Sequence, residues 1–303
     1  MQRVSDGYTI IEVLIFLAVS GFLLVVSMTF LSGRDAQTRF AASMRDAQSK
    51  FQDWLNDVPT GFAGGQSGNL NGDTYCVNPG SRIQIKNTGN PPDNPDCIYL
   101  GKAIQITDSS FATDPTQASM IYAYSIFGKR TDSSGELVNN IVDANPVPVV
   151  GIPPVSGSTV DFTDAYKLNG GAKVLSVKSK AVNYSGATLN STSHLAAFYL
   201  TFNQISANRN GSQDVKSYVY NLPNSQDPGN TGNGSNNAID DCLEMTSVAC
   251  RWQVSAPKDQ WPAALQEWDI CLGNDANENT AVLSVFSSSG LGASTKLEFK
   301  ACS

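Results

Sequence analysis

The sequence has few charged residues and a single histidine. Lys, Arg, Asp and Glu together make up 16% of the 303 residues, with 20 basic against 27 acidic side chains and a formal net charge of −7. An acidic chain without a basic segment is a poor candidate for nucleic-acid binding. Because His194 is the one histidine, multi-histidine metal sites and histidine-based catalysis are both disfavoured.

Short signatures of common enzyme classes are also missing. The sequence contains no nucleophile elbow, no glycine-rich phosphate loop and no HExxH zinc motif. His194 ends the polar run 190–194, which is typical of a turn or strand end and not of a Ser-His-Asp site. We therefore interpret the chain as a non-enzymatic protein without a cofactor, and a secreted enzyme is a distant alternative.

Charge is nearly absent from one long apolar segment near the N-terminus. Between Tyr8 and Gly33 the one charged side chain is Glu12, and the 21 residues 13–33 carry no charge. As a helix these residues would span about 32 Å, which matches the hydrocarbon thickness of a bilayer. The sequence thus predicts one membrane-spanning segment. A signal peptide cleaved near residues 18–20 and a plain membrane anchor are the rival interpretations.

Proline is absent before Pro59, and the helical pattern continues beyond the apolar segment. Apolar residues recur at steps of three and four, as on one face of an amphipathic helix, at Phe40, Met44, Ala47, Phe51, Trp54, Leu55 and Val58. The run 59–61 (Pro-Thr-Gly) is expected to end this helix. Residues 8–57 would then form one helix of about 75 Å, apolar all round in its first half and on one face in its second.

The cysteines are even in number and lie outside the apolar segment. No C-x-x-C spacing occurs, so disulfides in an oxidising compartment are favoured over zinc, with free buried thiols as the alternative. The six residues are Cys76, Cys97, Cys242, Cys250, Cys271 and Cys302. Six cysteines allow 15 pairings, and local loop closure favours Cys76–Cys97, Cys242–Cys250 and Cys271–Cys302.

Beyond the helix the pattern favours strands over helices. Alternating or β-branched and aromatic stretches predict strands at 82–86, 98–107, 118–127, 172–178, 195–205, 215–222, 280–287 and 296–300, and a short helix at 263–268. Since strands and helices do not alternate, a mostly antiparallel sheet is expected, and a long helix packed on such a sheet gives an α+β fold.

The loops add two weaker candidates for function. Residues 273–279 offer oxygen ligands at Asp275, Asn277 and Glu278, but without EF-hand spacing, so a metal is not assigned and calcium stays a weak candidate. Trp252, Trp261 and Trp268 are expected in the core or at an interface before they are expected at a ligand site.

The N-terminal residues carry a resemblance to a known family. Gly7-Tyr8-Thr9-Ile10-Ile11-Glu12, after a short polar leader and before an apolar helix, resembles the signature of type IV prepilins and pseudopilins, and the resemblance covers residues 1–58. It implies cleavage after Gly7 by a prepilin peptidase, N-methylation of Tyr8, and pairing of Glu12 with the N-terminal amine of a neighbouring subunit. Many major pilins carry a helix-kinking proline in this segment, so its absence implies a straighter helix and favours a minor pilin or pseudopilin.

The resemblance over residues 1–58 and the composition of the rest together imply an organisation, and the resemblance implies a set of partners. We expect a leader at 1–7, a transmembrane and assembly helix at 8–33, an amphipathic helix at 34–58, a β-rich globular domain with a Cys-stapled loop at 59–222, a flexible linker or loop at 223–238 and a Cys-rich C-terminal region at 239–303. The expected partners are other pilin subunits, the prepilin peptidase and an assembly platform in the cytoplasmic membrane, with no nucleic acid. The alternative is a membrane-anchored extracellular binding module or adhesin that does not polymerise.

The expected location follows from the motif and the cysteines together. Before assembly the chain would span the cytoplasmic membrane once with its soluble region outside, and afterwards it would belong to an extracellular pilus or the cell surface. A count of basic residues points the other way, because Arg3 precedes the apolar segment while Arg34, Arg39 and Arg45 follow it.

Overall fold

The fold is known from a computed structural model. It describes residues 9–60, 75–77, 84–86, 97–106, 109, 117–131, 134–138, 144, 146–149, 163–182, 188–192, 195–201, 215–221, 263–274, 279–288 and 292–302. Within the N-terminal helix, the backbone of residues 29–36 is described without their side chains.

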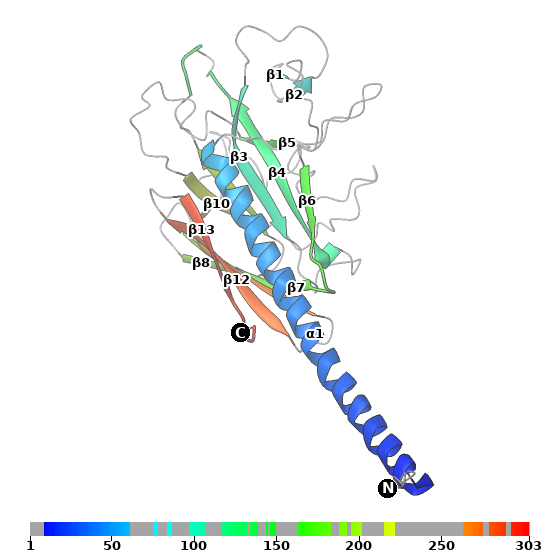
Figure 1. The fold of residues 1–303 in the computed structure, drawn as a ribbon. Coiled ribbons are helices and arrows are strands. Elements are labelled where there is room, and N and C mark those ends of the chain that lie inside the picture. The colour runs from blue at the N-terminus through cyan, green and yellow to red at the C-terminus, as the bar shows by residue number, and fades with distance from the viewer. Residues whose placement is uncertain are drawn as a thin grey trace, which may run out of the picture.

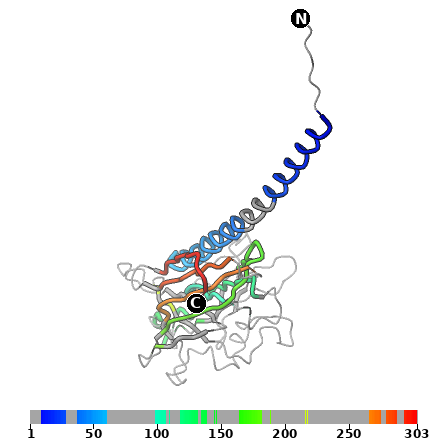
Figure 2. Tube along the Cα trace, turned by 90° about the horizontal axis from the view of Figure 1, so that it is seen from below, coloured from blue at the N-terminus to red at the C-terminus, as the bar shows by residue number. Residues whose placement is uncertain are grey.

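A single helix, α1 (Ile10–Thr60), forms the N-terminal part of the fold. Its second half lies along the sheet, whereas its first half projects away from the domain (Figures 1 and 2). The continuous helix agrees with the absence of proline before Pro59, which sits in the last turn. The hydroxyl of Thr60 donates to the carbonyl oxygens of Asn56 and Asp57, and so satisfies backbone groups that the ending helix leaves open.

The described strands form two antiparallel sheets. A hairpin-like pair joins β1 (Tyr75–Val77) to β2 (Gln84–Lys86). The larger sheet has 11 strands: β3 (Cys97–Ile106), β4 (Met120–Lys129), β5 (Val147–Val149), β6 (Thr163–Lys167), β7 (Lys173–Val182), β8 (Thr188–Thr192), β9 (Leu195–Thr201), β10 (Val215–Asn221), β11 (Ala263–Gly273), β12 (Thr280–Ser288) and β13 (Gly292–Glu298). An N-terminal apolar helix with antiparallel sheets confirms the α+β class.

The strands of the large sheet are not joined in chain order. The main path runs β13-β12-β11-β10-β9-β3-β4-β5, while β6 pairs with the same strand as β5 and β7 joins β11 to β8. Most of β11 lies between β7 and β12, and only Ala263 and Ala264 pair with β10. The segment 223–238 therefore separates β10 from β11 along the chain, but the C-terminal strands belong to the same sheet as those before it.

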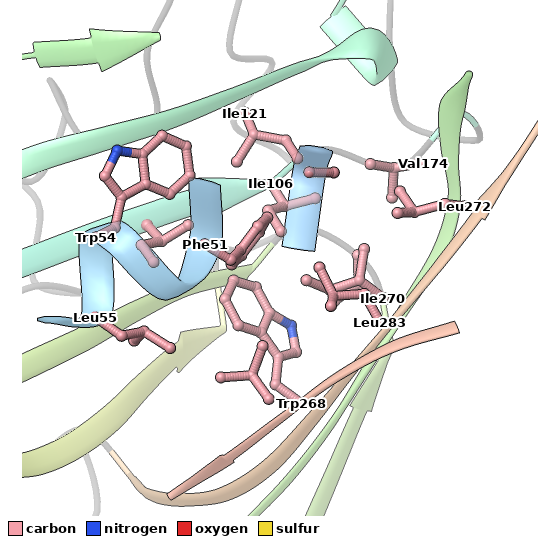
Figure 3. Packing of buried hydrophobic residues seen from close by; sticks show 14 of the residues in the cluster. Phe51, Trp54, Leu55, Ile106, Ile121, Val174, Trp268, Ile270, Leu272 and Leu283 are labelled. Atoms are coloured by element: carbon pink, nitrogen blue, oxygen red, sulfur yellow. The ribbon is translucent and has the colours of Figure 1, made fainter. Parts of the chain in front are cut away.

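One core joins α1 to the sheet. All seven predicted stripe residues of α1 are buried, with exposed fractions between 0% and 4%. They share a cluster with residues of several strands, including Ile106 of β3, Ile121 of β4 and Trp268 of β11 (Figure 3). Phe51 meets the ring of Trp54 edge-on at 5.4 Å and that of Trp268 at 6.4 Å. Burying each side chain of this size contributes about 1.5–3 kcal/mol, so the cluster holds the helix on the sheet.

The predicted helix at 263–268 is wrong, because these residues begin β11. The pairing of β11 with β7 has a bulge between Leu265 and Glu267. The extra residue places Leu265 and Trp268 on the buried face three positions apart, which imitates helical spacing. Strands β1, β5, β6 and β8 were not predicted at all, since they are short or polar.

One disulfide lies within the described residues. It joins Cys271 of β11 to Cys302, with 5.8 Å between the Cα atoms, and is one of the three pairs that local closure favours. Cys76 lies on β1 and Cys97 begins β3, but their side chains are not described. Cys242 and Cys250 lie outside the described residues, so the other two pairings stay predictions.

Candidate functional site

The first half of α1 is an apolar helix that packs against no other described part of the chain. Residues Ile10–Met28 are long and apolar enough to cross a membrane, and none of this segment is buried within the domain. Its large side chains are 46–83% exposed, from Ile10 at 83% to Val13 at 46%. A core helix of a soluble protein would be mostly buried, so this helix needs a lipid or protein environment, as a membrane anchor or a signal sequence does.

The few polar side chains of this segment are satisfied within the helix itself. The hydroxyl of Ser20 donates to the carbonyl oxygen of Leu17 at 3.1 Å, and that of Ser27 donates to Leu23 at 2.7 Å. Serine hydroxyls bonded in this way present no open donor to an apolar surrounding. Glu12 is then the one side chain between Ile10 and Met28 whose charge is out of place in such a surrounding.

Thr9 caps the start of α1 and its hydroxyl also contacts the Glu12 carboxylate. The backbone N–H of Glu12 faces the Thr9 hydroxyl at 3.4 Å, and that hydroxyl donates toward Oε2 of Glu12 at 3.5 Å. The N–H groups of Glu12 and Val13 also donate to the Thr9 carbonyl oxygen at 3.1 and 3.3 Å. Thr9 was not predicted as a site residue, although the spacing Thr-x-x-Glu before an apolar run indicates this cap.

The second half of α1 is fixed to the domain by polar contacts on one flank. Asp164 of β6 accepts a hydrogen bond from Nε1 of Trp54 and forms an ion pair with Lys50, both at 2.7 Å. Lys50 also lies 5.5 Å from the ring centre of Trp54. Two residues further along β6, the hydroxyl of Tyr166 donates to Asp46 at 2.7 Å. Strand β6 therefore clamps three successive turns of the helix.

Contacts on the other flank and at the two ends complete this attachment. On β13, Thr295 accepts from the side-chain amide of Gln48 at 3.4 Å and donates its hydroxyl to Gln52 at 3.1 Å. At the end where the helix enters the domain, Ser43 donates to the carbonyl oxygen of Asn169 at 2.9 Å. At the other end, Asp57 pairs with Lys102 at 2.7 Å. The exposed apolar half is thus carried on a rigidly held helix.

The charges at this attachment are perturbed in ways that follow from their surroundings. Burial alone would raise the pKa of Asp164, but hydrogen bonds from Lys50 and Trp54 outweigh it and hold the pKa below its usual value. Burial, together with the hydrogen bond to Asp46, raises the pKa of Tyr166. Burial and the nearby charge of Asp57 raise the pKa of Tyr99.

Most of the other predicted site residues lie outside the described residues. These are Gly7, Tyr8, His194, Trp252, Trp261 and the calcium candidates Asp275, Asn277 and Glu278. Trp268 is fully buried in the core. Within the part of the chain that the structure describes, no three His, Cys, Asp or Glu side chains gather as a metal site would require.

No protein-family model, curated protein or solved structure is significantly similar to this chain. Function is therefore inferred from the residues and their geometry.

Proposed function

We propose that this chain is a structural type IV pilin-like subunit, a minor pilin or pseudopilin that assembles into a helical surface fibre. In this proposal a prepilin peptidase cleaves after Gly7 and methylates the new N-terminus at Tyr8. The subunit waits in the cytoplasmic membrane with its globular domain outside, and an assembly platform then transfers it into the fibre.

The observation that carries the proposal is the division of α1 into a bare half and an attached half. Every large apolar side chain from Ile10 to Met28 is exposed, while the stripe from Phe40 to Val58 is buried against the sheet. A bare helix on a fixed base can exchange lipid contacts for contacts with the same helix of other copies, because both surroundings are apolar. The fibre core would consist of these helices.

Glu12 supplies the specificity that apolar contacts alone lack. A carboxylate left unpaired in an apolar bundle is costly, and a single polar residue in such a bundle can fix the register between helices. Cleavage after Gly7 would create an ammonium group on Tyr8, four residues before Glu12. Pairing between that ammonium group and Glu12 of a neighbouring copy would favour one register among many.

The contacts between Thr9 and Glu12 support a second candidate, a membrane-anchored binding module or adhesin that does not polymerise. Thr9 and Glu12 satisfy each other at the start of α1 in a single chain. In an isolated anchor, Glu12 would need no partner beyond its own helix end.

Two substitutions at Glu12 separate these candidates. Glu12→Gln removes the charge but keeps a side-chain oxygen that can accept from the Thr9 hydroxyl, whereas Glu12→Ala removes both. The measurement is the amount of the chain in sheared surface fibres relative to the membrane fraction, with Ser20→Ala as the control because Ser20 bonds only within its own helix. We expect both Glu12 variants to reach the membrane and to form few fibres. Fibre levels of wild type in Glu12→Gln would contradict a role of the charge in assembly.

A further inference from the structure

One end of the globular domain surrounds the point, near Arg39 and Ser43, where the exposed half of α1 leaves it. The turn 169–172 lies there, because Ser43 donates to the Asn169 carbonyl oxygen at 2.9 Å and a Cβ placed on Gly170 would lie 3.9 Å from the carbonyl oxygen of Arg39. Both central residues of this turn, Gly170 and Gly171, have positive φ angles of 68° and 72°, which glycine adopts without strain. The chain therefore turns back at this level and does not extend further along the helix.

The sheet register carries the same level across the three strands β7, β11 and β12 and on to the C-terminal tail. Lys173 at the start of β7 is opposite Gly273, Gly273 is opposite Thr280, and the Thr280 hydroxyl donates to the Lys300 carbonyl oxygen at 2.9 Å. We call residues 169–173, 273, 280 and 299–302 the helix-exit rim. In Figure 1 the C-terminus lies at this end of the domain, beside α1.

Phe299 lies on this rim and is exposed. Outside α1, only Phe299 and Leu137 are large apolar side chains with open surface among the described residues, at 50% and 48%. The tail that carries Phe299 is held by the disulfide Cys271–Cys302 and by the bond from Thr280 to Lys300. An exposed apolar side chain is ordinary by itself, so the position of Phe299 is what matters.

We infer that Phe299 contacts the headgroup region of the membrane while the chain is an anchored monomer. Arg39 follows the last apolar-segment residue, Gly33, by six positions, so the rim lies about 9 Å beyond the hydrocarbon edge when the helix is upright. The headgroup region is about 5–7 Å thick on each side. A tilt of about 20° toward the side that carries the sheet, the average size for spanning helices, lowers a point about 10 Å to that side by about 3 Å and so brings the rim into that region.

The contact is expected to depend on apolar and aromatic character more than on charge. Glu298 pairs with Lys296 and with Lys300, each at 2.5 Å, and Lys300 also lies in the field of Asp269 and Glu267. Both lysines are thus paired with a carboxylate, and residues 296–300 carry one net positive charge. Aromatic side chains concentrate at membrane interfaces because their rings tolerate both the apolar and the wet side.

Leu137 provides a matched reference at the opposite end of the domain. Strand β4 begins at Met120, opposite Lys167 and next to the rim, and ends at Lys129 about 30 Å away. Thr131 and Leu137 form a bridge just beyond that end. Leu137 is thus as exposed as Phe299 but distant from the helix exit.

The test uses the full-length chain in vesicles of phosphatidylethanolamine and phosphatidylglycerol, with and without a nitroxide on the lipid headgroup. Phe299→Trp and Leu137→Trp each add one tryptophan, and the signal is the fluorescence added over wild type. We expect the nitroxide to reduce the added signal of Phe299→Trp about twofold or more and to leave that of Leu137→Trp unchanged, because only the former lies at the interface. If the unfolding midpoint of Phe299→Trp differs from that of wild type, Ala301→Trp on the same exposed tail replaces this variant.

Equal quenching of both variants, or none in the rim variant, would overturn the inference. The inference rests on the anchored state of the proposed function. Failure of that state would give a different experimental result from failure of the rim contact. A chain without a membrane span would not float with the vesicles at all, whereas a failed rim contact leaves it anchored and unquenched.

Discussion

Lys102 and Asp57 form an ion pair of 2.7 Å between β3 and the last turns of α1, and only 4% of the Lys102 side chain is exposed. Asp57 is 25% exposed, so the pair is buried on the sheet side and open to water on the helix side. The contact lies at the end of α1 opposite the bare segment. It joins the helix to a central strand of the sheet, which pairs with both β4 and β9.

Removing Asp57 should destabilise the domain more than its own exposure suggests. Asp57→Ala leaves the Lys102 ammonium group buried without its counter-charge, which typically costs about 3–5 kcal/mol. The measurement is denaturant unfolding of the full-length chain in detergent micelles, followed by circular dichroism.

The double variant Asp57→Ala with Lys102→Met is the control. A methionine can occupy the space of the lysine stem without a charge, so most of the lost stability should return. If Asp57→Ala alone is as stable as wild type, the ion pair does not hold the helix on the sheet.

Acid should weaken the clamp of β6 on α1. The pKa of Asp164 is lowered on folding, because hydrogen bonds from Lys50 and Trp54 outweigh its burial. Its contribution to stability is therefore present above the ordinary value of about 3.9 and is lost as the pH falls through the lower folded value. Asp164→Asn should lower stability at neutral pH and flatten its decline below about pH 4.

Glu298 is the control for this pH dependence. Hydrogen bonds from Lys296 and Lys300 lower its pKa to about 2, but the residue is on the surface, where salt screens such pairs. In high salt, Glu298→Gln should retain the acid decline of wild type while Asp164→Asn does not. Identical pH profiles for wild type and Asp164→Asn would show that this clamp does not contribute.

The disulfide should stabilise the C-terminal strands. Cys271 and Cys302 are separated by 31 positions, and closing a loop of that size contributes about 3–4 kcal/mol in the chain-entropy estimate. The variant with alanine at both positions should lower the free energy of unfolding by about this amount and release the tail that holds Phe299. Unchanged protection of the β12 and β13 amides from hydrogen exchange in that variant would contradict this role.

The helix was predictable because its signal is long and consistent. A charge-free run followed by a stripe from Phe40 to Val58 predicts one continuous helix with an exposed and a buried half. Every stripe residue is buried in the structure. The alternation of β-branched and aromatic residues likewise located β3, β4 and β10 within a few residues. These elements are defined by local periodicity alone.

The rest depends on tertiary contacts that local pattern does not encode. The bulge in β11 gives Leu265 and Trp268 a helical spacing, and pairing with both β7 and β12 overrides it. Strand β6 is short and polar, yet Asp164 and Tyr166 form one flank of the helix attachment. At the candidate site, Glu12 was predicted from its charge in an apolar run, while Thr9 was missed although the local spacing Thr-x-x-Glu indicates the cap.

The N-terminus of the mature chain tests the account most directly. Intact-mass and N-terminal peptide mass spectrometry of the chain purified from its native cell surface is the measurement, with Gly7→Leu as the variant that should retain the leader. The account predicts a chain that has lost residues 1–7 and begins at N-methyl-Tyr8. A native chain that begins at Met1 or near Gly21 would contradict it.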